Sequence, residues 1–337
     1  MQLPRLGMGC SALGNLYRAV SDAEAQNTLR SALAAKISYF DTAPLYGFGL
    51  SEHRLGSALA SYDSQHVVIS TKVGRLLVPT SKFGPRDGFV NALPYAPVFD
   101  YSFSGVMSSF EASLDRLQRS RVNILFAHDL GARTHGNDSQ RMTASFLAGG
   151  YRAMQELRSA GRIDAIGLGV NETEICEELL DAVELDVILL AGRYTLLEQG
   201  ALRLLDRCAR MGVKVIIGGP FNSGLLVEAE ESQNLHYNYE PAPAEVIARV
   251  RALRATCSRF DVPLPAAALR FPIAHPAVVC VLPGLAAEHE IQQALQWRDQ
   301  RIPSRLWPAL CDAGLLSREV PMPAAEFLDW PSMQKGV

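Results

Sequence analysis

The sequence predicts a single α/β domain over residues 1–337, a closed (β/α)8 or TIM barrel of eight strand–helix units. Short apolar runs alternate eight times with helical segments, which is the pattern of a parallel sheet covered by helices. No linker-like stretch interrupts the alternation, and 337 residues with 48% apolar content suffice for one barrel. A doubly wound sheet would need a Gly-x-Gly-x-x-Gly turn after its first strand, whereas Gly7-Met-Gly9 continues Cys-Ser-Ala.

The strands are expected in short runs rich in β-branched and aromatic residues. They lie at residues 6–10, 40–41, 67–73, 122–128, 165–170, 187–191, 214–218 and 278–282. Helices are expected where apolar residues recur at intervals of three and four. The clearest lie at residues 22–35, 51–60, 106–117, 151–157, 244–259 and 265–271. Ser21 and Glu24 form a capping box that predicts where the first helix begins.

Other stretches lack this regularity. Residues 74–103 interleave proline and glycine with aromatic residues, Phe83 among them, and predict a long loop. Loops of this length inside a compact domain usually serve function, so we expect a wall of the substrate site. The alternative is a surface excursion packed by its own aromatic rings. Residues 133–137 are expected to form another loop, and the Pro-rich C-terminal tail is expected to lie on the outside.

Composition narrows the class of protein. The net charge of −3 and the lack of a dense Lys/Arg run argue against nucleic-acid binding. No secretory signal or membrane span is recognisable, so no membrane partner is expected. The six cysteines are scattered without a Cys-x-x-Cys pair, which argues against disulfides and a metal site and favours the cytoplasm. The sequence leaves the oligomeric state open.

Four chemically active side chains follow successive strands. Asp41 and Tyr46 lie in a strand that enters a Gly-rich loop, while Lys72 and His128 end the next two strands. Barrel enzymes build their sites at this end of the strands. Taken singly, each residue has a structural explanation: a cap, a loop anchor, a strand-end charge and a core histidine. Together they predict a proton-transfer site, and we call them the tetrad.

Each member of the tetrad has an expected role. A tyrosine hydroxyl has a reference pKa of about 10, too high for easy proton transfer at neutral pH. We expect the ammonium of Lys72 to lower the pKa of Tyr46 and make it an acid or base. Asp41 is placed to pair with Lys72, and His128 is expected to donate a hydrogen bond to a substrate oxygen.

Two small-residue turns follow the seventh and eighth strands, where barrels of this kind bind phosphate through backbone N–H groups. The alternative is a pair of ordinary tight turns. The candidate cofactor-binding residues in them are Gly219, Pro220, Phe221, Asn222, Ser223, Gly224, Pro283 and Gly284.

The run Phe40-Asp-Thr-Ala-x-x-Tyr-Gly47, the Thr71-Lys72 strand end and His128 resemble the aldo-keto reductase family over nearly the whole chain. The resemblance implies that the tetrad is catalytic. Residues 43–52, 167–172, 191–199 and 218–226 look like its bacterial aldose 1-dehydrogenase branch, which acts on L-fucose and D-threo-aldoses, with pyridoxal 4-dehydrogenase close by. This implies nicotinamide-dependent oxidation of a cyclic hemiacetal to a lactone, with a small sugar or aldehyde as substrate.

The resemblance also indicates the cofactor. Asn171 matches a residue that holds the nicotinamide carboxamide, although the neighbouring residues Gly169, Val170 and Ala191 depart from the family pattern. Glu290 falls where NADP-preferring members carry an Arg. A carboxylate repels the 2′-phosphate and accepts a hydrogen bond from a ribose hydroxyl. We therefore expect NAD as the preferred cofactor, with NADP possible.

Tyr17, Arg18 and Arg193 are candidates for binding substrate hydroxyls, and a surface salt bridge is the alternative for each arginine. Three other functions stay open from the sequence: a pyridoxal 4-dehydrogenase, a general aldehyde reductase, and a non-catalytic regulatory subunit that only binds the cofactor.

Overall fold

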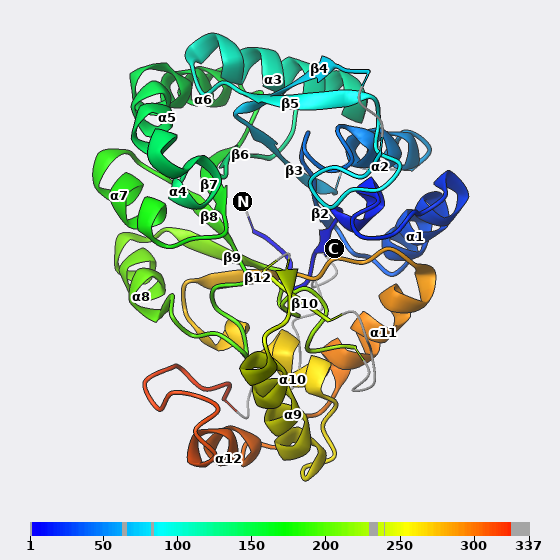
Figure 1. The fold of residues 1–337 in the computed structure, drawn as a ribbon, viewed down its shortest axis with the longest axis vertical. Helices are drawn as coiled ribbons and strands as arrows, with labels where there is room; N and C mark the ends of the chain where they lie inside the picture. The colour runs from blue at the N-terminus through cyan, green and yellow to red at the C-terminus, as the bar shows by residue number, and fades with distance from the viewer. Residues whose placement is uncertain (1, 63–65, 82–83, 229–234, 239, 325–337) are drawn as a thin grey trace, which may run out of the picture.

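Eight parallel strands form a ring, and helices surround it (Figure 1). The computed structural model describes residues 2–62, 66–81, 84–228, 235–238 and 240–324. The ring runs in the order β1 (Met8–Gly9), β2 (Tyr39–Asp41), β3 (Val68–Val73), β6 (Ile124–His128), β7 (Ala165–Val170), β8 (Val187–Ala191), β9 (Lys214–Gly218) and β12 (Val278–Leu282). Parallel bridges from Leu6 to Val281 and from Gly9 to Gly284 close it. The predicted barrel is confirmed.

The outer helices follow the strands along the chain, as the alternation predicts. They are α1 (Asp22–Ala34), α2 (Leu50–Ala60), α3 (Phe103–Leu117), α6 (Tyr151–Ser159), α7 (Glu174–Ala182), α8 (Leu202–Met211), α9 (Ala244–Ser258), α10 (Leu264–Arg270) and α11 (Glu288–Asp299). The predicted capping box at Ser21 and Glu24 is present, with each side chain bonded to the other residue's backbone N–H. None of the described helices is long and apolar enough to cross a membrane.

Two layers of apolar side chains make the core. The larger lies between the strands and the helices. The smaller fills the barrel and consists of Tyr39, Ile124, Phe126, Ala165, Val187, Leu189, Ile216, Cys280 and Leu282. Since side chains occupy the barrel interior, reactive groups can gather only at an end of the strands.

The segment after β3 is more regular than expected. Instead of an irregular loop, β4 (Arg75–Pro79) pairs antiparallel with β5 (Tyr95–Phe99) to form a two-stranded hairpin. The prolines did not prevent pairing, because an isolated hairpin has two open edges where a missing N–H is tolerated. Phe83 lies outside the described residues.

Two further stretches add structure that the sequence did not predict. Residues 133–137, expected as a loop, are helical and belong to α4 (Ala132–His135) and the 3-10 turn Gly136–Asp138, which lead into α5 (Ser139–Ser145) and a π-helical turn. After β9 a second hairpin forms from β10 (His236–Tyr237) and β11 (Glu240–Pro241).

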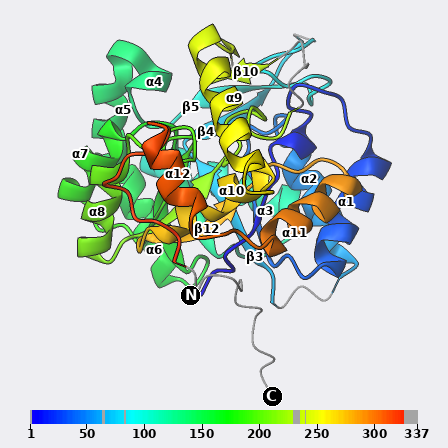
Figure 2. The ribbon, with the colours of Figure 1, turned by 90° about the horizontal axis from the view of Figure 1, so that it is seen from below.

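Part of the expected C-terminal tail is helical. Helix α12 (Leu306–Asp312) packs against α9 on the outside of the barrel (Figure 2). Pro308 is tolerated because it lies in the first turn, where its missing N–H would have no partner within the helix. The tail beyond residue 324 lies outside the described residues.

A close approach of α2 to α3 gives a test of the packing. Adding a Cβ at Gly56 would place it 2.6 Å from the carbonyl oxygen of Leu117. We expect Gly56→Ala to lower the free energy of unfolding by about 1–3 kcal/mol, through overpacking, although Gly-to-Ala usually stabilises an open helix. Ser57→Ala, on the exposed face of the same helix, is the control. Urea denaturation measures both, and a gain in stability for Gly56→Ala would contradict the packing described here.

Candidate active site

A buried ion pair joins the ends of β2 and β3. The Lys72 Nζ atom donates hydrogen bonds to Asp41 Oδ2 at 2.7 Å and to the Thr42 carbonyl oxygen at 2.8 Å. Ser70 Oγ donates to the other carboxylate oxygen of Asp41 at 2.7 Å. The side chains of Lys72 and Asp41 are only 2% and 4% exposed. The predicted pairing is confirmed, and both charges are hydrogen-bonded on several sides, as buried charges require.

The other two members of the tetrad approach this pair. The Lys72 Nζ atom lies 4.7 Å from the centroid of the Tyr46 ring. The ring of His128, at the end of β6, meets the Tyr46 ring edge-on with centroids 6.2 Å apart. The structure therefore brings Asp41, Tyr46, Lys72 and His128 together at one end of the barrel.

The pKa of Tyr46 differs from the expectation. Burial raises the pKa of the phenol well above its ordinary value, and the negative charges of Asp41 and Asp129 raise it further. The expected net lowering is therefore wrong for the side chains described, because burial and the carboxylates of Asp41 and Asp129 outweigh the attraction of the Lys72 ammonium, whose charge Asp41 partly offsets at 2.7 Å.

His128 is shifted in the opposite direction. Burial lowers its pKa well below the ordinary value, and the positive charges of Arg75 and Lys72 lower it further. The imidazole is therefore neutral at neutral pH, and a neutral ring carries one N–H donor. This protonation state fits the expected hydrogen-bond donor.

A second buried ion pair lies beside the tetrad and was not predicted from the sequence. Arg75, the first residue of β4, donates to Asp129 Oδ2 at 2.6 Å. Asp129 also lies 3.4 Å from His128 Nε2 and accepts a 3.3 Å bond from the Asn171 amide. The sequence feature that could have pointed to Asp129 is its position, since it is a charged residue directly after the strand that ends in His128.

Aromatic side chains of the segment after β3 reach the site. The ring centroid of Phe89 lies 6.3 Å from that of Tyr46 and 6.1 Å from that of Phe48. The hydroxyl of Tyr101 donates to the His128 carbonyl oxygen at 2.6 Å. This segment thus borders the tetrad, consistent with a substrate wall.

The turn after β9 has the shape of a phosphate cradle. Gly219, Asn222, Ser223 and Gly224 have positive φ angles of 56°, 47°, 58° and 95°, a backbone shape that can turn successive N–H groups toward an anion. Pro220 has no N–H, so it contributes only to the shape. The turn is therefore a candidate site for the pyrophosphate of a nicotinamide dinucleotide.

Two side chains of this turn are engaged within the protein. Phe221 is buried, and its ring meets Trp297 at a centroid distance of 5.8 Å. The Asn222 side chain accepts from Thr195 Oγ at 2.6 Å and donates to Glu198 Oε1 at 3.3 Å. They fix the turn, in which the N–H groups of Gly219 and Asn222 also donate to the carbonyl oxygens of Leu282 and Gly219.

The end of β12 contributes the second turn. Gly9 donates its N–H to the Pro283 carbonyl oxygen at 2.9 Å, so Pro283 and Gly284 also close the barrel. Glu290, in the first turn of α11, accepts the Ala286 N–H at 2.6 Å. The carboxylate is thereby held at the N-terminus of α11, where it offsets the positive end of the helix dipole.

Each of the three substrate-binding candidates interacts with a residue outside the tetrad. Tyr17 stacks on His236 of β10, with centroids 5.2 Å apart, and bonds to Ser223 of the cradle. Arg193 pairs with Glu198 at 3.0 Å and also contacts Asn238.

Arg18 is exposed, and its charge acts on Glu24 at the start of α1. The described interaction of Arg18 is therefore with the start of α1. Tyr17 and Arg193 instead connect the cradle and the loop after β8 to the β10–β11 hairpin.

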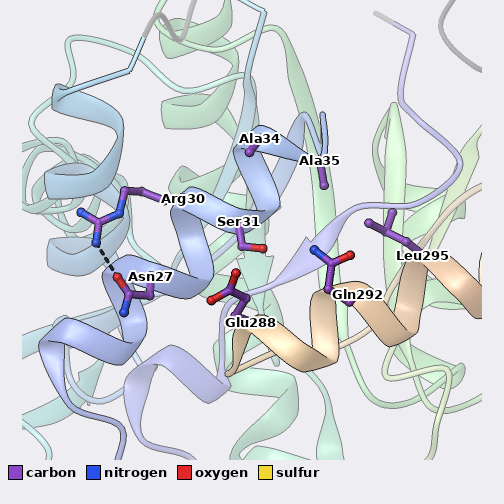
Figure 3. A pocket seen from close by; sticks show the side chains of 8 residues that line it. All are labelled: Asn27, Arg30, Ser31, Ala34, Ala35, Glu288, Gln292 and Leu295. Carbon is purple, nitrogen blue, oxygen red and sulfur yellow. Dashed lines mark hydrogen bonds between the residues drawn. The ribbon is translucent and has the colours of Figure 1, made fainter.

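A surface hollow between α1 and α11 lies outside the barrel (Figure 3). It is lined by Asn27, Arg30, Ser31, Ala34, Ala35, Glu288, Gln292 and Leu295. No member of the tetrad lines it. Among the described residues, no cluster of three or more His, Cys, Asp or Glu side chains could hold a metal ion.

Comparison with known proteins identifies the family. The Aldo/keto reductase family profile matches residues 5–310. The chain is 41% identical to a pyridoxal 4-dehydrogenase of Microbacterium luteolum, over 93% of this chain and 94% of that protein. It is 36% identical to a D-threo-aldose 1-dehydrogenase of a Pseudomonas species, over 94% and 95%. An aldo-keto reductase structure from Bacillus halodurans, 22% identical, superimposes with a TM-score of 0.72 and coverage of 95% and 97%. The chain therefore belongs to the aldo/keto reductase family and is an oxidoreductase that uses a nicotinamide cofactor.

Proposed function

We propose that the protein oxidises the hemiacetal carbon of a cyclic aldose to a lactone, with NAD as the preferred cofactor. The observation that carries this proposal is the buried Lys72–Asp41 pair beside Tyr46, together with the neutral ring of His128, which meets the Tyr46 ring edge-on. The likeness to a D-threo-aldose 1-dehydrogenase supports an aldose substrate. Since the tetrad is assembled, a non-catalytic regulatory role is disfavoured.

Each residue of the tetrad has a separate role in the proposed reaction. A bound nicotinamide supplies the acceptor for the carbon-bound hydrogen as hydride. Tyr46, as phenolate, accepts the hydroxyl proton of the hemiacetal, while the N–H of His128 holds that oxygen in place. The positive charge of Lys72 favours the phenolate against the effect of burial, which raises the pKa of Tyr46, and Asp41 holds Lys72 in position.

The turn after β9, residues 219–224, is proposed to hold the pyrophosphate, together with Pro283 and Gly284. Asn171, whose amide donates to Asp129 at 3.3 Å, is proposed to hold the nicotinamide carboxamide. The free cysteines, five of them buried, support a cytoplasmic location.

A second function is favoured by a specific likeness, the 41% identity to a pyridoxal 4-dehydrogenase. Pyridoxal also forms a cyclic hemiacetal, so the same tetrad would oxidise it by the same proton transfer. The two proposals share the site and differ in the substrate. A general aldehyde reductase would use the same residues in the opposite direction.

The substrate is tested by initial rates of NADH formation with L-fucose, L-galactose, D-arabinose, D-glucose and pyridoxal. We expect the sugars that share the ring configuration of L-fucose to have the highest kcat/KM. Turnover of pyridoxal alone would replace the sugar proposal with the second one. No turnover of any compound in the presence of bound NAD+ would contradict both.

Tyr46→Phe is expected to lower kcat for oxidation by about 10²–10⁴-fold, the usual contribution of general acid–base catalysis. Cofactor affinity should change little, because the phenol hydroxyl acts on the substrate. Tyr151→Phe removes a hydroxyl that bonds only to Glu184, on the outside of the barrel, and serves as the control. A Tyr46→Phe variant that kept most of its activity would show that another group moves the proton.

Glu290→Gln tests the cofactor preference. The amide can still accept the Ala286 N–H but carries no charge, so we expect kcat/KM with NADP+ to rise about tenfold and that with NAD+ to change little. Glu288→Gln, in the same helical turn, is the matched control. An equal effect of both variants, or equal use of both cofactors by the wild type, would contradict a role for Glu290.

A further inference from the structure

The Arg75–Asp129 ion pair is the feature of the site that the mechanism above does not use. Its two side chains are 7% and 11% exposed, and their nearest charged atoms are 2.6 Å apart. Arg75 opens the β4–β5 hairpin, and Asp129 follows β6. The pair therefore joins the segment that borders Tyr46 to the strand end that carries His128.

Polar atoms around this pair are buried but unsatisfied. Among the residues the structure describes, neither Arg75 Nε nor His128 Nδ1 has a hydrogen-bond partner, although both atoms are buried. A buried polar atom without a partner costs free energy, so such atoms are rare in folded proteins. One of them, His128 Nδ1, belongs to the ring that meets the Tyr46 ring edge-on, which indicates that a polar ligand group completes the site.

The backbone at Asp129 supports the same interpretation. Its φ angle is +48°, a left-handed conformation that is uncommon for residues other than glycine. The Asn171 amide and the Arg75 guanidinium hold the carboxylate from two sides. Strained backbone of this kind tends to occur where a side chain is held for binding or catalysis.

We propose that Arg75 and Asp129 determine substrate specificity by binding the hydroxyl that lies nearest to the reacting carbon. A hydroxyl both donates and accepts a hydrogen bond, so the Asp129 carboxylate accepts from it while Arg75 donates to it. In an aldose this group is the 2-hydroxyl, and in pyridoxal it is the ring hydroxyl. The inference rests on the proposed oxidation of a cyclic hemiacetal and adds the group that is recognised.

A purely structural ion pair makes a different prediction. If the pair only anchored the β4–β5 hairpin, its loss would affect every substrate alike. If it binds one hydroxyl, its loss would matter only for substrates that carry that hydroxyl. Measuring each variant with one substrate that carries the hydroxyl and one that lacks it distinguishes the structural role from the specificity role.

The experiment measures kcat/KM for L-fucose and 2-deoxy-L-fucose, and for pyridoxal and its 3-deoxy analogue, with wild type, Asp129→Asn and Arg75→Lys. Whether the protein oxidises the sugars or the pyridoxal compounds, we expect the kcat/KM of the wild type to be roughly tenfold to a hundredfold higher for the hydroxylated compound than for its deoxy analogue. In both variants this ratio should fall toward one, mainly through loss of activity on the hydroxylated compound.

Arg116→Lys is the matched control, because Arg116 forms another buried 2.6 Å pair, with Glu52, between α2 and α3. It should lower the melting temperature and leave the substrate ratio unchanged. If the wild type oxidised the deoxy analogue as well as the hydroxylated compound, or if the variants kept the wild-type ratio, the proposed role of Arg75 and Asp129 would be wrong. The proposed oxidation itself would stand. A wild type that oxidises none of these compounds would overturn the proposed function and this inference with it.

Discussion

The buried pair of Lys72 and Asp41 is the interaction on which the rest of the site depends. It joins adjacent strands, and Ser70 and Thr42 complete its hydrogen bonds. Removing one partner of such a pair leaves an isolated buried charge, which typically costs about 3–5 kcal/mol. The barrel can hold an ammonium close to the Tyr46 ring only because the carboxylate is there to balance it.

The barrel explains why distant parts of the sequence meet in one site. Apolar side chains fill its interior, so polar groups collect where β2, β3 and β6 end. The segment after β3 then covers this end with aromatic rings, Phe89 facing Tyr46 and Tyr101 bonded to the backbone of His128. Burial by these neighbours raises the pKa of the phenol and lowers that of the imidazole. The same enclosure that excludes water therefore sets both protonation states.

The tetrad could be predicted because its residues end strands whose order follows from the alternation of β and α segments. Arg75 and Asp129 could not, because their pairing depends on the β4–β5 hairpin, whose prolines made it look irregular. The direction in which the pKa of Tyr46 is shifted could also not be predicted from the sequence. It depends on how fully the ring is buried and on how far Asp41 offsets the charge of Lys72. The sequence pattern was enough to predict where the tetrad lies, whereas the pKa of Tyr46 depends on how the folded chain packs around it.

The most direct test of this electrostatic account is the pH dependence of kcat/KM for substrate oxidation, in wild type and in Lys72→Met. Because oxidation needs the phenolate and the pKa of Tyr46 is raised, activity should rise with pH on the alkaline side. Methionine keeps the length of the side chain and removes its charge, so the rise should move to higher pH. An alkaline limb at the same pH in both proteins would contradict the claim that Lys72 controls the ionisation of Tyr46.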